Sequence, residues 1–368
     1  MTRAASGAGG SVAPGFEVVR DAFEQVAGDD ACAFVAEVDG ERVCDLGSRG
    51  FGTDAATVLY SGTKGVVATV LLVLVERGPL RLDAPVRELW PEFARNGKDE
   101  TTVAGVLAHC AGLPAVERPL VRADIARPRF LAAELAGQAP LVPPGRPCYH
   151  AVTWGWLAGE LILRATGRTA GAVVRELLEE PLRLDLRLGL DAGDPLAARL
   201  VRPVAVPGYR LSAFMADDPD PRLQLVYGNP PIAIEDWAEP EMTRIEAPAV
   251  NGVATAASMA ALYGGLACGE VVGLETIAAA SALAGEGDDP LTGRPLRYGP
   301  TGYELAGTPS PLGPVADALG HTGAGGGTHG AWPSLRTGFS FLPATLRPQD
   351  ADRRAPELLD ALHTALAA

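Results

Sequence analysis

The chain has 368 residues, 47% of them hydrophobic, so it can bury a large core, and its length suggests about two structural units. Its 31 basic and 45 acidic side chains give a net charge of −14. No run of lysine or arginine offers the basic patch that nucleic-acid binding needs, so nucleic acid is not expected as a partner. The longest mainly apolar run, 66–75, is too short to span a bilayer, so no membrane is expected either.

The N-terminus is rich in glycine, alanine and serine, which predicts a flexible segment over residues 1–12. It has no apolar stretch of the kind found in secretory signals, so we expect a cytoplasmic protein.

Helical spacing of apolar residues over 16–26 predicts a first helix. Two β-type runs then flank Asp39-Gly40, a pair typical of a tight hairpin turn.

Five scattered cysteines form no C-x-x-C pair. An odd number without metal-ligand spacing predicts reduced thiols, and no structural metal or other cofactor is expected.

The segment 63–77 is apolar on most faces and ends at Gly78-Pro79, so it predicts a buried helix. The middle of the chain is mostly helical in pattern. Residues 201–250 are proline-rich, acidic and without clear periodicity, which predicts a long loop or lid. Its aromatic residues Phe214, Tyr227 and Trp237 either wall off water from a site or pack the loop itself. Strand-like alternation near the C-terminus is followed by a closing helix from about residue 355.

Ser61-Gly62-Thr63-Lys64 lies at the entrance of the buried helix. Residues three apart share a helical face, so the hydroxyl and the amine can form a hydrogen bond. A serine becomes a nucleophile when a base takes its proton, and a lysine can be that base when burial lowers its pKa. The S-x-x-K pattern alone is more often coincidence, but Lys64 is one of only two lysines among the 31 basic residues.

Two later segments add chemistry. Tyr149 follows a Pro-Pro-Gly loop and can share a proton relay with Lys64, whose ammonium would favour the phenolate. The alternative is a core aromatic residue. The glycine-rich run 320–327 can bring backbone N–H groups close to a ligand, as an oxyanion hole requires, although hairpin turns look similar.

In this order, the three segments resemble the serine β-lactamase/penicillin-binding-protein superfamily, especially the class C enzymes and the related esterases and transacylases. Residues 78–86, 101–114 and Asn251-Gly252 also match, so the resemblance covers most of the chain. It implies an α+β, β-lactamase/transpeptidase-like fold, in which an antiparallel sheet is flanked by helices and a helical domain is inserted. Residues 13–75 and 255–368 would form the α/β domain. Residues 76–254 would form the mainly helical domain, with the long loop at 201–250.

The resemblance also implies roles for individual residues. Ser61 would be the nucleophile, Lys64 and Tyr149 the acid/base pair, and the backbone N–H groups of Ser61 and Ala324 the oxyanion hole. The remaining residues carried over are expected to bind substrate: Ala151, His321, Thr322 and Gly323.

Two positions depart from the β-lactamase pattern. Ala151 stands where those enzymes have an asparagine, and His321 stands where they have a lysine. Both changes favour an ester-directed enzyme: a carboxylester hydrolase, or a transacylase that passes the acyl group to an amine or alcohol, as in natural-product biosynthesis. The expected partners are therefore a small acyl donor and such an acceptor. The alternatives are a true β-lactamase or D-Ala-D-Ala peptidase, and a non-catalytic binding protein on the same fold.

The other histidines are expected to be structural. His150 should face away from the site, His109 should fix the turn at Gly112–Pro114, and His329 should lie exposed at a strand edge.

Overall fold

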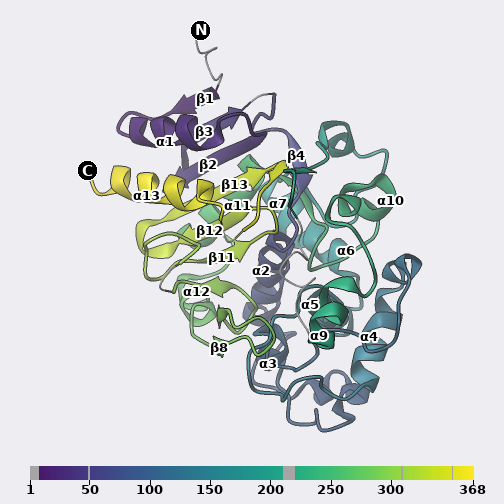
Figure 1. Cartoon of the computed structure of the whole chain (residues 1–368). Coiled ribbons are helices and arrows are strands. Elements are labelled where there is room, and N and C mark those ends of the chain that lie inside the picture. Colours follow the sequence, from purple (N-terminus) through teal and green to yellow (C-terminus); the bar gives the residue numbers. More distant parts are fainter. Residues whose placement is uncertain (1–7, 49, 210–219, 308–309, 350) are drawn as a thin grey trace.

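The computed structural model describes residues 8–48, 50–209, 220–307, 310–349 and 351–368. Its central feature is a nine-stranded antiparallel sheet that joins the two ends of the chain (Figure 1). The strands, in spatial order, are β1 (Ala8–Val12), β3 (Glu41–Ser48), β2 (Cys32–Val38), β13 (Thr337–Pro343), β12 (Thr328–Trp332), β11 (Leu319–Thr322), β10 (Glu304–Leu305), β9 (Pro295–Tyr298) and β8 (Gly285–Asp288).

Helices cover both faces of this sheet. On one face, α1 (Glu17–Ala27) packs against α13 (Arg354–Leu366), and buried Phe23 and Leu358 belong to their shared core. The other face carries α2 (Gly62–Glu76), α11 (Ala256–Cys268) and α12 (Leu274–Ala280). Helix α2 is buried from Gly62 through Leu74, which explains why its sequence is apolar on every side. The α+β, β-lactamase/transpeptidase-like fold is thereby confirmed.

The middle of the chain supplies most of the remaining helices, which lie together beside the sheet layers in Figure 1. They are α3 (Val103–Leu107), α4 (Pro128–Gly137), α5 (Thr153–Thr166), α6 (Ala170–Val174), α7 (Glu180–Leu182), α9 (Pro221–Gly228) and α10 (Pro240–Thr243). A π-helical turn spans Arg175–Glu179, and 3-10 turns occupy 86–88, 91–94, 122–126, 195–199, 234–238 and 333–335. No helix of the described residues combines the length and the apolarity needed to cross a membrane.

Two small sheets tie this middle segment to the ends of the chain. One contains β4 (Ala56–Val58), β7 (Val253–Thr255) and β5 (Leu186–Arg187). The other pairs β6 (Val204–Ala205) with β14 (Thr345–Leu346) in parallel. The proposed division into an α/β domain and an inserted helical domain stays a prediction.

The N-terminal segment differs from the expected flexible arm. Residues 8–12 form edge strand β1, paired antiparallel with β3, while residues 1–7 lie outside the described part. The small residues that indicated flexibility are needed for close pairing: a Cβ on Gly10 would lie 1.9 Å from the Asp45 carbonyl oxygen. The hairpin at Asp39-Gly40 is confirmed, because both residues have the positive φ of such a turn, 51° and 79°.

The segment 201–250 is also more ordered than a plain loop. It contains α9, α10, β6 and a 3-10 turn, and Asp220 caps α9 by accepting a hydrogen bond from the Arg222 N–H at 2.9 Å. Two of the prolines that suggested a loop, Pro221 and Pro240, instead begin helices, because proline is compatible with the first helical position. Residues 210–219 of the predicted loop lie outside the described part of the chain. Trp237 is buried, and Phe214 lies outside the described residues.

Candidate active site

Ser61 lies at the N-terminal end of α2, in the position that the sequence predicts. The preceding residue, Tyr60, has a left-handed backbone (φ 49°), and its hydroxyl donates to the Ile234 carbonyl at 3.1 Å. The start of α2 sits close against the sheet, because a Cβ on Gly62 would lie 2.7 Å from the His329 ring. The tight turn and the glycine together fix where Ser61 presents its hydroxyl.

Lys64 is fully buried and its Nζ lies within hydrogen-bond distance of four oxygen atoms. These are Ser61 Oγ (3.0 Å), Tyr149 Oη (3.1 Å), and the carbonyl oxygens of Ala151 (2.8 Å) and Ala249 (3.1 Å). Burial lowers the pKa of Lys64 to about 7. A neutral amine has two N–H groups, which the two carbonyls can accept, so its lone pair is left for the hydroxyls. Lys64 can therefore take a proton from Ser61.

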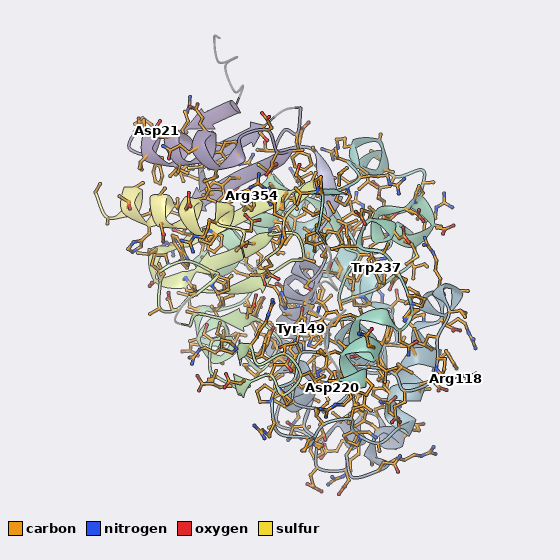
Figure 2. All side chains as sticks on the ribbon, viewed as in Figure 1. Asp21, Arg118, Tyr149, Asp220, Trp237 and Arg354 are labelled. Carbon is orange, nitrogen blue, oxygen red and sulfur yellow. The ribbon has the colours of Figure 1, made fainter. Side chains whose placement is uncertain are left out.

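Tyr149 completes a triangle with these two side chains, since its hydroxyl donates to Ser61 Oγ at 2.8 Å. Its backbone N–H donates to Asp289 at 3.0 Å, and its ring stacks on Tyr298 with centroids 6.3 Å apart. Burial raises the pKa of the phenol well above its usual value, so Tyr149 is a phenol. The expected phenolate is therefore disfavoured in this site, because burial raises the Tyr149 pKa and also lowers the pKa of the lysine whose ammonium would stabilise the phenolate. Figure 2 shows Tyr149 near the centre of the molecule.

The glycine-rich run forms a tight turn against the start of α2. Gly323 N–H donates to the Gly327 carbonyl at 2.7 Å, and a Cβ on Gly323 would lie 2.5 Å from the Leu59 carbonyl oxygen. This contact brings Ala324 to the same cavity as Ser61. Within the described chain, neither the Ser61 nor the Ala324 N–H donates to another protein group, so both are available to a ligand oxygen. The geometry is compatible with an oxyanion hole.

A cavity of about 260 Å³ opens at Ser61 and contains several of the predicted site residues. Ala151, Thr322 and Ala324 line it together with Tyr149. The segment 201–250 supplies much of the remaining wall, including Tyr227 on α9 and Trp237. The segment 201–250, which the sequence predicts as a long loop or lid, therefore borders the site.

His321 and Gly323 are not wall residues of this cavity. His321 is 1% exposed, because its position on β11 turns its side chain toward α2, where its Cβ packs beside Gly65. Its Nδ1 donates to the Thr322 carbonyl at 2.7 Å, and burial lowers its pKa to about 3, so it is neutral. The expectation that His321 contacts substrate is corrected: it lies behind the wall that Thr322 presents.

Three other histidines are buried. His150 Nε2 accepts from the Leu113 N–H and His109 Nδ1 accepts from the His150 N–H, both at 2.9 Å, so this pair supports the turn near residue 112. The structural role expected for them agrees with these contacts. His329 is 0% exposed and its Nδ1 lies 2.8 Å from Ser340 Oγ. Its expected exposure is wrong, because β12 pairs on both sides and is not an edge strand.

Sequence reasoning missed two carboxylates in the cavity wall, Asp289 and Glu304. Asp289 positions Tyr149 through the backbone contact described above. Glu304 lies on the two-residue strand β10, and its Oε2 accepts from the Thr322 N–H at 2.7 Å. Neither belongs to a motif in the sequence, and only the pairing of β9, β10 and β11 brings Glu304 to the site.

Comparison with known proteins agrees with this architecture. The Beta-lactamase family matches residues 21–363, so the chain belongs to that family and is an enzyme of its serine-hydrolase group.

Individual relatives are similar over most of their length. The chain is 32% identical to the esterase/beta-lactamase LipL of Mycobacterium tuberculosis, over 84% of this chain and 75% of LipL. A penicillin-binding protein homologue from Caulobacter crescentus has 33% identity and a TM-score of 0.86, over 98% of this chain and 100% of that one. A family VIII carboxylesterase has 29% identity and a TM-score of 0.87, with the same coverage. The names of LipL and of the carboxylesterase give ester hydrolysis as an activity of these two relatives.

Proposed function

We propose that this enzyme cleaves carboxylic esters through an acyl-Ser61 intermediate. The observation that carries the proposal is that buried Lys64 contacts the hydroxyls of both Ser61 and Tyr149. Burial lowers the pKa of this lysine to about 7. A base with a pKa near the working pH is the arrangement that favours proton transfer in catalysis. The esterase names of the relatives support the same choice.

The steps follow from these contacts. Neutral Lys64 takes the Ser61 proton while Oγ forms a bond to the ester carbonyl carbon, and the electron pair of the carbonyl moves to its oxygen. The N–H groups of Ser61 and Ala324 stabilise this oxyanion. When the carbon–oxygen bond to the alcohol breaks, the leaving oxygen takes the Tyr149 proton. The Lys64 ammonium then returns a proton to Tyr149, which leaves both side chains neutral and the acyl group on Ser61.

A fluorophosphonate tests the nucleophile, because it replaces the serine proton with a phosphonyl group and releases fluoride. Intact mass spectrometry should show one adduct on the wild type and none on Ser61→Ala. An equal adduct on both proteins, or none on the wild type, would contradict the role of Ser61 as the nucleophile.

The acceptor that resolves the acyl-enzyme decides between hydrolase and transacylase. An amine or alcohol held by the aromatic walls would compete with water for the same intermediate. Measuring acid and amide products from one simple ester at increasing amine concentration separates the two: a transacylase diverts product to the amide at low amine concentration, and a hydrolase does not.

A β-lactamase or peptidase activity is the second candidate, and it is favoured by the similarity to LipL, an esterase/beta-lactamase. Against it, Ala151 lines the cavity where β-lactamases present an asparagine amide, and the buried His321 offers no cation to a substrate carboxylate. We expect slow or no turnover of a chromogenic cephalosporin, and rapid Ser61-dependent turnover would restore this candidate. A non-catalytic binding role is disfavoured by the intact triangle of Ser61, Lys64 and Tyr149.

A further inference from the structure

Glu304 is a wall residue of the Ser61 cavity that the proposed mechanism does not use. Its side chain is 20% exposed, and its Oε2 accepts the Thr322 N–H at 2.7 Å. The Thr322 side chain also forms a hydrogen bond with this carboxyl. Both of these bonds come from one residue, and a carboxylate can accept about four, so Glu304 keeps accepting capacity toward the cavity.

No lysine or arginine in the described part of the chain forms a salt bridge with this carboxyl, although the charge of Lys64 acts on it from outside salt-bridge distance and lowers its pKa. The one basic nitrogen within salt-bridge distance is His321 Nδ1, at 3.8 Å, and that ring is neutral and donates to the Thr322 carbonyl. The Lys64 N–H groups are taken by the carbonyls of Ala151 and Ala249. Burial raises the pKa of Glu304, so the ionised carboxylate is disfavoured in the empty cavity, and a positive group that enters the cavity would stabilise it.

Aromatic rings surround the same space. Tyr298 stands directly opposite Glu304 in the β9–β10 ladder and stacks on Tyr149, so both rings lie beside the carboxylate. The aromatic residues that line the cavity are Tyr60, Tyr149, Tyr209, Tyr227, Trp237 and Tyr298. The faces of such rings attract organic cations, above all quaternary ammonium groups.

The cavity wall contains two other charged side chains, and neither is placed as well as Glu304 to attract a cation. Asp289 uses both carboxylate oxygens on backbone N–H groups, those of Tyr149 and Leu291. Arg294 is exposed to solvent, whereas Glu304 is mostly enclosed. The charge of Glu304 therefore acts more strongly on a ligand in the cavity than the charge of Arg294, because water screens the exposed arginine.

We propose that Glu304 and the rings around it bind a positively charged ammonium group of the substrate, so that the enzyme prefers cationic esters to neutral esters of the same shape. The inference rests on the proposed esterase function and names its substrate class.

Two pairs of esters test it, each pair differing only in whether nitrogen or carbon carries three methyl groups. For a cation on the alcohol side, butyrylcholine is compared with 3,3-dimethylbutyl butyrate in a pH-stat. For a cation on the acyl side, the para-nitrophenyl ester of γ-trimethylammoniobutyrate is compared with that of its carbon isostere. The wild type should favour the cation in at least one pair by about tenfold or more in kcat/KM.

Glu304→Gln should bring that ratio close to unity. Glu357→Gln is the matched control, since it removes the same charge from the exposed face of α13 and should leave the ratio unchanged. On the wild type alone, choline should inhibit hydrolysis of a neutral ester, and 3,3-dimethylbutanol at the same concentration should not. This comparison needs no variant.

Equal rates within both pairs, or a cation preference that survives in Glu304→Gln, would overturn the inference. The same holds if choline and the neutral alcohol inhibit alike. In these cases Ser61-dependent turnover of the neutral esters would still support the proposed function. Absence of Ser61-dependent turnover for every ester would overturn both.

Discussion

Lys64 Nζ lies 3.1 Å from the carbonyl oxygen of Ala249, which is 185 positions further along the chain. The turn that presents this carbonyl is held by the Asn251 amide through three hydrogen bonds. Nδ2 donates to the Met242 and Ile245 carbonyls at 2.7 Å each, and Oδ1 accepts from the Ala247 N–H at 3.0 Å. Asn251 is therefore a positioning residue for the base, although it does not line the cavity.

Asn251→Ala should disorder this turn and admit water to Lys64. We expect the free energy of unfolding to fall by about 2–4 kcal/mol, because three buried hydrogen bonds are lost. The Lys64 pKa should rise toward its usual value, which moves the pH profile of kcat/KM to higher pH. Thermal unfolding and a pH series measure the two effects.

Asn229→Ala is the matched control. Its amide makes an equivalent set of three hydrogen bonds, to Val116, Arg118 and Leu120, and none to Lys64. Because Asn229 lines the Ser61 cavity, the control is read from the midpoint of the pH profile and not from the rate. This variant should lose stability without a shift of the pH profile. A shift of equal size in both variants would contradict the positioning role of Asn251.

The pH dependence of the wild type follows from the same lysine. Burial lowers the pKa of Lys64 to about 7, and the proposed mechanism needs the neutral amine. kcat/KM for a neutral ester should therefore rise as pH increases through about 7 and then level off. Rates that fall over this range, or do not change, would contradict a lysine base. Measurement from pH 5 to 9 with a buffer-corrected blank is sufficient.

Single substitutions of Ser61 and Tyr149 should distinguish the roles of these two residues in catalysis. Ser61→Ala should reduce turnover by about 10³-fold or more, because no acyl-enzyme can form. Tyr149→Phe keeps the ring and loses the hydroxyl, so we expect a loss of about 10²-fold to 10⁴-fold in kcat. An ester with a very good leaving group should suffer less from Tyr149→Phe, since it departs without a proton. Equal losses for good and poor leaving groups would argue against Tyr149 as the acid.

The close approach of helices α2 and α11 gives a stability prediction. A Cβ on Gly65 would lie 2.1 Å from Tyr263 Oη, a buried hydroxyl without a partner among the described residues. Gly65→Ala should destabilise the fold by about 1–3 kcal/mol through this clash. Tyr263→Phe removes the oxygen, so Gly65→Ala in that background should be much less harmful. Chemical denaturation of the wild type, the two single variants and the double variant measures the coupling between the two positions. If the changes in the free energy of unfolding simply add, the clash is not with Tyr263.

The fold class and the grouping of Ser61, Lys64 and Tyr149 could be predicted because their signals are local or ordered along the chain. Ser61 and Lys64 are three residues apart on one helix, and Tyr149 follows a loop of recognisable composition. The roles predicted for Ser61, Lys64, Tyr149 and Ala324 agree with the contacts and still require the experiments above.

Other features depend on which strands become neighbours, and the sequence does not state this. His329 was expected at an exposed edge because alternation does not show that β12 is an inner strand. Glu304 sits on a strand of two residues, too short to leave a periodic pattern. The direction of the His321 side chain is set by the register of β11, and one residue of shift would reverse it.

The pairing of β2 with β13 has a consequence for synthesis on the ribosome. The serine-bearing helix α2 leaves the ribosome tunnel well before the two strands against which it packs, β11 and β12. Long-range strand pairing of this kind forms slowly and late. The start of α2, with Ser61, therefore takes up its final surroundings against the turn at Gly323 only after these strands have been made.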